Sequence, residues 1–133
     1  MTIITVMSLA IITVTLSDQE TANKKSLLMR LNELGSSALA RGRLEIAEDY
    51  HQRALIIGKE LDDEREIALS LINLGLVANF REELDKAEEY YQRAFAISER
   101  LEYKKGMARS LFGFGLLSLD RKDPASARNY WQR

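Results

Sequence analysis

Residues 71–95 read LINLGLVANFREELDKAEEYYQRAF, and parts of this segment occur again forty residues earlier and forty residues later. Leu74-Gly75, for example, corresponds to Leu34-Gly35 and to Phe114-Gly115. In an ungapped alignment the first two copies are identical at fourteen of forty positions. A fixed period of this length is typical of stacked supersecondary units, none of which can bury its apolar face alone. The sequence therefore predicts a repeat architecture.

The apolar residues of each copy indicate helices, because they recur at steps of three and four residues. In the second copy these residues are Ile67, Leu71, Leu74, Gly75 and Ala78. We expect an all-α fold with no strand after residue 16. The predicted helices lie near residues 24–40, 44–60, 65–80, 84–100, 104–120 and 124–133.

Two of the predicted helices have start signals. Asp123-Pro124 suits a helix start, because an Asp side chain accepts from the free N–H groups and Pro fits the first turn. Asp62 or Asp63 is expected to cap the third helix in the same way. The segments between helices are short, so consecutive helices are expected to form hairpins.

Three sets of corresponding residues are assigned to packing between these helices. The glycines lie inside predicted helices, where Gly costs about 1 kcal/mol relative to Ala, so we attribute them to close approach of the partner helix. The second helices carry small residues at one matching position and rings at another, and the rings are expected to pack between adjacent units. The three sets are Gly35, Gly75 and Gly115, then Ala47, Ala87 and Ala127, then His51, Tyr91 and Trp131.

The pattern of Leu71, Leu74-Gly75, Ala78, Ala87 and Tyr91 resembles the tetratricopeptide repeat (TPR) family. The forty-residue period is similar to the extended variant of bacterial and archaeal signalling proteins and of kinesin-light-chain scaffolds. The resemblance covers residues 24–133. It implies tandem antiparallel hairpins stacked into an α–α superhelix, or solenoid. The expected units are residues 24–63, 64–103 and 104–133, the last of them incomplete.

The resemblance also implies a non-catalytic scaffold for protein–protein interaction, with a concave groove lined by the first helix of each pair. Apolar groove residues would hold a partner helix or extended peptide, while Asn and Arg would fix its backbone or a carboxylate. Helical spacing places Asn32, Leu69, Ile72, Asn73, Leu76, Asn79, Arg109, Phe112 and Leu116 on this groove. In the alternative, the N-terminal apolar segment or further repeats cover the same face.

Composition argues against several other classes of function. The net charge is −1 with both signs mixed along the chain, so the basic stripe of a nucleic-acid-binding surface is missing. The chain has no Cys and one His, His51, at a position where the other copies have aromatic rings. Acidic clusters such as residues 62–64 lack the spacing of a calcium loop. We expect no catalytic residue, no metal and no cofactor.

Residues 1–23 differ from the rest of the chain, because Met1–Leu16 is uncharged and rich in Ile, Val and Thr. This stretch is shorter than the roughly 20 residues that a spanning helix needs. Three interpretations stay open: a signal or anchor, a helix or strand that packs on the first repeat, or a disordered or foreign end. We expect a cytoplasmic protein, with export or membrane tethering through this segment as the alternative.

The third unit stops at Arg133, before the residues that complete the second unit. We expect either a fragment of a longer chain or a bare end that self-associates. Two rivals to a simple scaffold follow. One is a regulatory arm of a larger bacterial-type signalling protein. The other is a membrane-tethered assembly factor.

Overall fold

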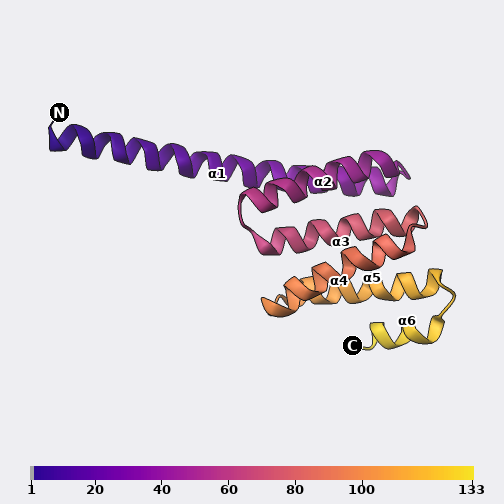
Figure 1. Cartoon of the computed structure of the whole chain (residues 1–133). Helices are drawn as coiled ribbons and strands as arrows, with labels where there is room; N and C mark the ends of the chain where they lie inside the picture. The colour runs from indigo at the N-terminus through magenta and orange to yellow at the C-terminus, as the bar shows by residue number, and fades with distance from the viewer. Residues whose placement is uncertain (1) are drawn as a thin grey trace.

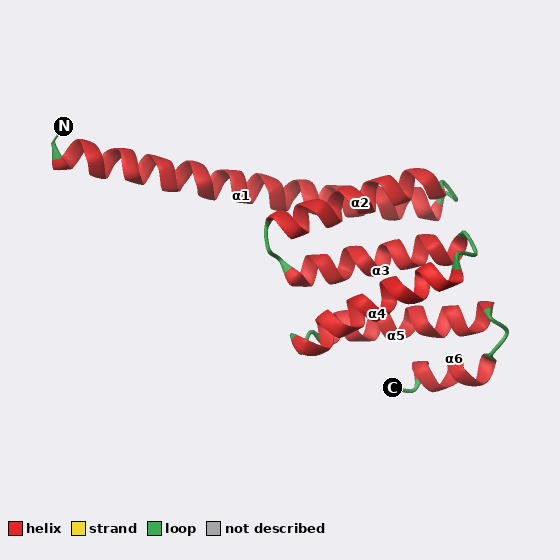
Figure 2. Ribbon diagram, in the orientation of Figure 1, coloured by secondary structure: helices red, strands yellow, loops and turns green. Residues whose placement is uncertain are grey.

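The computed structural model describes residues 2–133. Over this range it contains six α-helices and no strand, which confirms the predicted all-α class (Figure 2). The helices are α1 (Ile3–Ala40), α2 (Leu44–Glu60), α3 (Glu64–Phe80), α4 (Leu84–Arg100), α5 (Lys104–Asp120) and α6 (Pro124–Trp131). From α2 onward, every helix begins within one residue of its predicted start.

The helices are arranged as three antiparallel hairpins, α1–α2, α3–α4 and α5–α6, here called units 1, 2 and 3 (Figure 1). Each hairpin packs on the next, through α2 against α3 and α4 against α5. The first helix of unit 2, α3, also contacts the first helices on both sides of it, α1 and α5. The first helices therefore form one continuous face, as expected of a helical solenoid.

All five turns between helices use the same backbone conformation. The residue after each C-cap has a positive φ, between 52° and 73°, and these residues are Gly42, Asp62, Glu82, Glu102 and Lys122. The following N–H donates to a carbonyl five residues earlier, as in Arg43 to Ala38 and Asp63 to Gly58. This bond satisfies carbonyls that the end of a helix leaves free. The turn is thus repeated every twenty residues, although only Gly42 and, to a lesser degree, Asp62 have residue types that favour it.

The two predicted helix caps are present. Asp63, rather than Asp62, accepts from the backbone N–H of Glu66 at the start of α3. Asp123 accepts from the N–H of Ser126, with Pro124 in the first turn of α6. Asp62 instead occupies the left-handed position of the turn. Adjacent aspartates thus have different roles, one in the turn and one as the cap.

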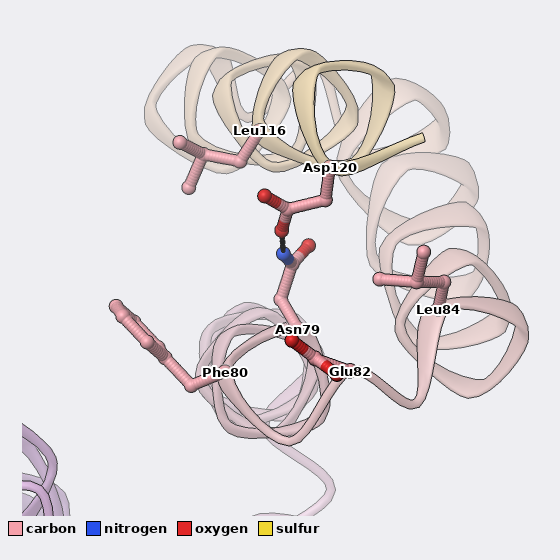
Figure 3. Close-up of a pocket in the computed structure, with 6 residues that line it drawn as sticks. All are labelled: Asn79, Phe80, Glu82, Leu84, Leu116 and Asp120. Atoms are coloured by element: carbon pink, nitrogen blue, oxygen red, sulfur yellow. Dashed lines mark hydrogen bonds between the residues drawn. The ribbon is translucent and has the colours of Figure 1, made fainter. Parts of the chain in front are cut away.

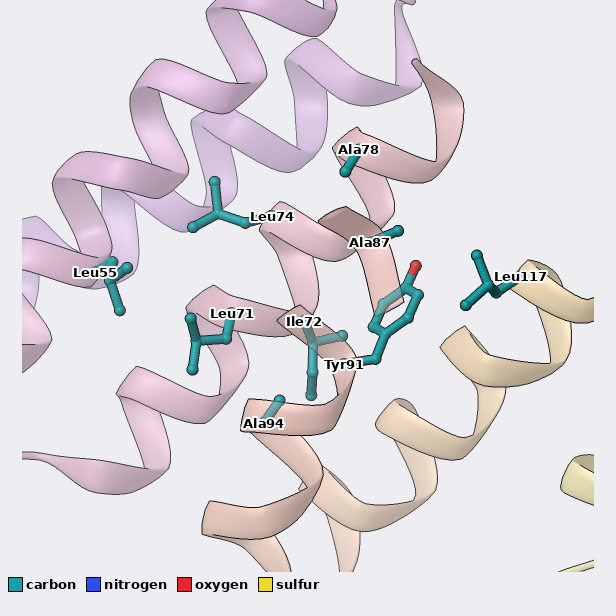
Figure 4. Close-up of a cluster of buried hydrophobic side chains, with 9 residues drawn as sticks. All are labelled: Leu55, Leu71, Ile72, Leu74, Ala78, Ala87, Tyr91, Ala94 and Leu117. Carbon is teal, nitrogen blue, oxygen red and sulfur yellow. The ribbon is translucent and has the colours of Figure 1, made fainter. Parts of the chain in front are cut away.

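The main cluster of buried apolar side chains lies between α3 and α4 of unit 2 and extends to Leu55 of α2 and Leu117 of α5 (Figure 4). Tyr91 of α4 is fully buried there, with its ring between α3 and α5. A methyl group added to Gly75 or to Gly113 would lie 2.5 Å from Cε1 of this ring. Tyr91 also meets the ring of Phe114 edge to face, with the centroids 5.9 Å apart. The two glycines therefore provide the space that one aromatic ring occupies.

The same ring–glycine arrangement occurs in the other units. In unit 1, a methyl group on Gly35 would lie 2.6 Å from His51, and in unit 3 a methyl group on Gly115 would collide with Trp131. The small residues predicted on the second helix of each unit are also buried, namely Ala47, Ala87 and Ala127. Trp131, however, is 47% exposed, so it does not pack between two units as Tyr91 does.

Ion pairs repeat across the joints between units. Arg81 lies 2.9 Å from Glu48, and the corresponding Arg121 lies 2.9 Å from Glu88. Both pairs join the end of a first helix to the second helix of the preceding unit. These pairs help to fix how one unit stacks on the next. Because both arginines are paired with carboxylates outside the groove, they are not available to a ligand in it.

The N-terminal segment differs from expectation, because α1 begins at Ile3 rather than near residue 24. Residues 2–23 are exposed throughout and extend beyond unit 1 as a rod (Figure 1). The alternative in which this segment packs on the first repeat is therefore wrong for the described chain. A helix satisfies the backbone hydrogen bonds of β-branched residues internally, and no Gly or Pro interrupts it before Gly35. By length and composition, α1 is the one described helix that could cross a membrane.

Candidate functional site

The face formed by α1, α3 and α5 carries an open depression of about 470 Å3, here called the central depression. Each of the three helices contributes to it at corresponding turns. Its lining consists of Met29, Asn32, Glu33, Ser36, Glu66, Leu69, Asn73 and Arg109. Four of the predicted groove residues are therefore brought together here, namely Asn32, Leu69, Asn73 and Arg109.

Glu66 is a lining residue that the sequence analysis did not single out. Its side chain is half-buried, and burial, followed by the nearby charge of Asp63, raises the pKa of its carboxyl above the ordinary value. Lys25 and Lys105 oppose that shift. Arg109, across the depression, is exposed and forms no salt bridge within residues 2–133. The depression thus combines apolar side chains, the carboxylates of Glu33 and Glu66, and one cation, Arg109, that has no salt-bridge partner in residues 2–133.

A hydrogen-bond chain connects the central depression to the core of unit 1. Asn73 donates through Nδ2 to Oδ1 of Asn32 at 3.4 Å, and Nδ1 of His51 lies 3.0 Å from the same oxygen. Because an amide oxygen only accepts, Nδ1 of His51 carries the proton in this arrangement. Nε2 of His51 is buried without a partner in the described chain. Burial lowers the pKa of His51 from 6.5 to about 4, so the ring is neutral at physiological pH.

A second hollow, here called the turn-end hollow, lies between the C-terminal ends of α3 and α5 and measures about 600 Å3. Its lining consists of Asn79, Phe80, Glu82, Leu84, Leu116 and Asp120. Figure 3 shows Asn79 and Asp120 pointing toward one another across the gap, where Nδ2 of Asn79 donates to the Asp120 carboxylate. Behind them, burial and the charge of Asp120 raise the pKa of Tyr91.

A third hollow, here called the end hollow, lies between α5 and α6 and measures about 370 Å3. Phe112 and Trp131 stack there, with ring centroids 6.4 Å apart. Phe112 is 54% exposed, whereas its counterpart in unit 2, Ile72, is 3% exposed because α5 packs over it. The end hollow is therefore the surface on which a fourth unit would stack in a longer array. Self-association through it stays a prediction.

The predicted groove residues thus do not form a single surface. Ile72 is a core residue, and its assignment to the groove is wrong because the joint between units 2 and 3 covers that side of α3. Leu76 is half-buried and packs against the same core. Asn79 and Leu116 line the turn-end hollow, and Phe112 lines the end hollow.

The sequence analysis missed Glu82 and Asp120, which line the turn-end hollow together with Phe80. Both residues depart from the repeat, because the corresponding residues one unit earlier are Gly42 and Phe80. It also missed Gly113, which contacts the same ring as Gly75. Residues that differ from their counterparts in the other units therefore mark the lining of the hollow, whereas residues that match them mark the packing of the units.

No group of three or more His, Asp or Glu side chains within residues 2–133 is placed to hold a metal ion. His51, on α2, is fully buried within unit 1, so its ring is not accessible from solvent. What the described surface offers is a set of open hollows along consecutive helices.

Comparison with known proteins gives the same architecture. A family model described as tetratricopeptide repeat matches residues 26–100 and 66–133. The chain belongs to the tetratricopeptide repeat family. The crystal structure of the TPR domain of Arabidopsis FLU is similar, with a TM-score of 0.72 and 21% sequence identity, over 82% of this chain and 92% of that chain. No match is found among curated proteins.

Family membership gives a general function. Tetratricopeptide repeats typically act as non-catalytic scaffolds for protein–protein interaction, so the partner class is protein. The specific extended variant stays a prediction. The similarity to the FLU domain is low in sequence and supports the fold alone.

Proposed function

We propose that the face formed by α1, α3 and α5 binds a segment of a partner protein, either a helix or an extended peptide. The observation that carries this proposal is the central depression, since side chains of three successive first helices line it. Met29 and Leu69 supply apolar surface, and their counterpart in unit 3 is Arg109. A bound segment could bury apolar side chains against unit 1 and unit 2 and pair a carboxylate with Arg109.

The hydrogen-bonding groups of the depression favour an ordered partner backbone. Asn32 and Asn73 are held by each other and by His51, so their remaining donors and acceptors have fixed directions. Preorganised polar groups of this kind lose little conformational entropy when a ligand binds. The rod of residues 2–23 leaves this face open in the described chain.

Reversal of one charge tests the proposal. The full chain is used to capture partners, which mass spectrometry identifies, and capture is then repeated with Arg109→Glu. We expect at least about tenfold weaker capture, because a favourable ion pair becomes a repulsion. Arg93→Glu is the matched control, since Arg93 is exposed on the second helix α4 and should leave capture unchanged.

Two results would contradict groove binding. One is normal capture by Arg109→Glu, and the other is loss of capture by Arg93→Glu alone, which would assign binding to the opposite face. Phe112→Glu changes the separate end hollow. It therefore distinguishes partner capture in the groove from self-association through the end of the array, which analytical ultracentrifugation measures.

A second candidate, a membrane-tethered assembly factor, is favoured by the projecting part of α1. Large apolar side chains at residues 3–16 are at least half exposed on all sides of the helix. A helix that is apolar all round is usually buried in protein or in lipid. The hydroxyls of Thr13 and Thr15 donate to the carbonyls of Leu9 and Ile11, which removes two donors that hydrocarbon would leave unsatisfied.

The charges that follow this segment favour a cytoplasmic location for the repeats. Lys24, Lys25 and Arg30 lie within the flanking region in which basic residues favour the cytoplasmic side. Residues 3–17 form about 22 Å of uncharged helix, shorter than a bilayer core of about 30 Å, so insertion requires local thinning. The proposed arrangement is a short anchor with the binding face in the cytoplasm.

Fractionation tests the anchor. We expect the full chain to sediment with membranes, to resist alkaline washing and to be released by detergent. A chain that starts at Ser17 should stay in the soluble fraction with an unchanged helical repeat domain. Equal distribution of the two chains between membrane and soluble fractions would contradict the tether and leave the groove proposal intact.

A further inference from the structure

The turn-end hollow contains charged residues that stacking of the units does not require. The equivalent place at the joint between units 1 and 2 would be lined by Leu39, Ala40, Gly42, Leu44, Leu76 and Phe80. Those residues include no carboxylate, yet α2 packs on α3 much as α4 packs on α5, although α1 and α3 contact each other less than α3 and α5 do. Asn79, Glu82 and Asp120 are therefore additions to a surface that packs without them.

The two carboxylates of the hollow have no cation. Within residues 2–133, neither Glu82 nor Asp120 forms a salt bridge. The nearest basic residues in sequence are already engaged, Arg81 with Glu48 and Arg121 with Asp85 and Glu88. The negative charge at this end of the groove face is thus left for a partner from outside the chain.

A buried polar group in the same hollow points independently to a ligand. Asn79 is more than nine-tenths buried, and its Oδ1 has no hydrogen-bond partner in the described chain. Its Nδ2 already donates to Asp120, which fixes the orientation of the amide (Figure 3). A buried carbonyl without a donor costs about 1–3 kcal/mol, so a ligand that supplies N–H groups gains by satisfying it.

An aromatic ring completes the arrangement. Phe80 lies at the rim of the hollow and is 65% exposed. An exposed ring beside carboxylates attracts a cation over its face. Leu116 and Leu84 supply apolar wall for the stem of a long side chain.

We propose that the turn-end hollow is a subsite for an arginine side chain of the partner segment, which rests on the proposed function of the groove face. A guanidinium is planar, stacks on aromatic rings and presents five N–H donors. Those donors match the acceptors present, namely the Glu82 and Asp120 carboxylates and Oδ1 of Asn79. A lysine ammonium has three donors and cannot stack in this way.

The subsite also gives the bound segment a direction. Arg109 in the central depression is suited to an acidic residue, while the turn-end hollow near the C-terminal ends of α3 and α5 is suited to a basic one. A partner segment with the two charges at opposite ends would therefore bind in one orientation. In the reversed orientation the acidic residue would meet the carboxylates of Glu82 and Asp120 in the turn-end hollow.

A small-molecule titration tests the subsite without the partner. The isotope-labelled full chain is titrated with N-acetyl-L-arginine amide, and NMR follows the side-chain amide of Asn79 and the ring of Phe80. We expect saturable shifts at these residues. N-acetyl-L-citrulline amide, which has nearly the same shape but no charge, should bind at least about fivefold more weakly.

Substitutions in the hollow sharpen the test. Asp120→Asn keeps an acceptor for Asn79 and should weaken arginine-amide binding about fivefold, since it removes one charge. Phe80→Leu should weaken it about threefold by removing the ring face. Glu99→Gln, an exposed carboxylate on α4 outside the hollow, is the matched control and should bind as the parent chain does. Circular dichroism checks that each variant keeps its helices.

Three results would overturn the subsite: equal binding of the citrulline amide, equal weakening by Glu99→Gln, or tighter binding of N-acetyl-L-lysine amide. The first two would mean that no specific guanidinium site exists. Failure here with intact, Arg109-dependent partner capture would refute the subsite alone. Normal arginine-amide binding with capture insensitive to Arg109→Glu would refute the groove proposal alone.

Discussion

Replacement of Tyr91 by alanine should lower the free energy of unfolding by about 3–5 kcal/mol, the largest loss that we expect from one substitution in this chain. Tyr91 is fully buried and fills the space between Gly75 of α3 and Gly113 of α5. Its removal opens a cavity at the joint of units 2 and 3, which two glycines cannot fill. Urea unfolding followed by circular dichroism measures the loss.

Tyr91→Phe keeps the ring and removes only the hydroxyl. This variant should not lower the free energy of unfolding as Tyr91→Ala does. The hydroxyl of Tyr91 is buried without a hydrogen-bond partner in residues 2–133. Its removal should leave stability unchanged or raise it by about 1 kcal/mol, because an unsatisfied buried polar group is lost. A loss of stability as large as that of Tyr91→Ala would mean that the hydroxyl, and not the ring, holds the joint together.

The second large effect is a dependence of stability on pH that arises from one residue. His51 is fully buried, and burial lowers its pKa from 6.5 to about 4. Between those values the unfolded chain binds a proton that the folded chain does not, so stability falls as the pH is lowered. We expect the free energy of unfolding to be about 2 kcal/mol lower at about pH 5 than at about pH 7.

His51→Phe provides the control, because the other units have aromatic rings at this position and the substitution removes the titrating group. The difference in stability between the two pH values should largely disappear in this variant. Glu66, whose pKa is raised by burial, contributes with the opposite sign, but it does so equally in both chains. A pH dependence that persists in His51→Phe would show that His51 is not its source.

The fold could be predicted from the sequence because residues with the same packing role recur at equivalent positions in all three units. The matched small residues and rings are the ones that meet in space, as Gly75 meets Tyr91 and Gly35 meets His51. Helix starts were predictable where a side chain caps the helix, as at Asp63 and Asp123. These features depend on contacts within one unit or between neighbouring units, so local spacing encodes them.

Other features depend on geometry that spacing does not encode. The left-handed turns at Glu82, Glu102 and Lys122 have residue types that do not favour positive φ, and stacking of the helices imposes the conformation. Ile72 follows the same helical spacing as the groove residues, but α5 covers it. The turn-end hollow combines residues from two units, and both units depart from the repeat there, at Glu82 and at Asp120. A periodic pattern predicts what the units share and not where they differ.

The continuity of α1 has a mechanical consequence. No turn or loop separates Leu16 from Leu28, the first fully buried residue of the helix, and the twelve helical steps from one to the other span about 18 Å at 1.5 Å per residue. A continuous helix is stiff over this length and behaves as a strut rather than as a tether. Any partner that binds the N-terminal part of α1 would therefore fix both the distance and the tilt of the repeats relative to itself. A pair of glycines inserted between Leu16 and Leu28 would make the helix flexible there and remove both constraints.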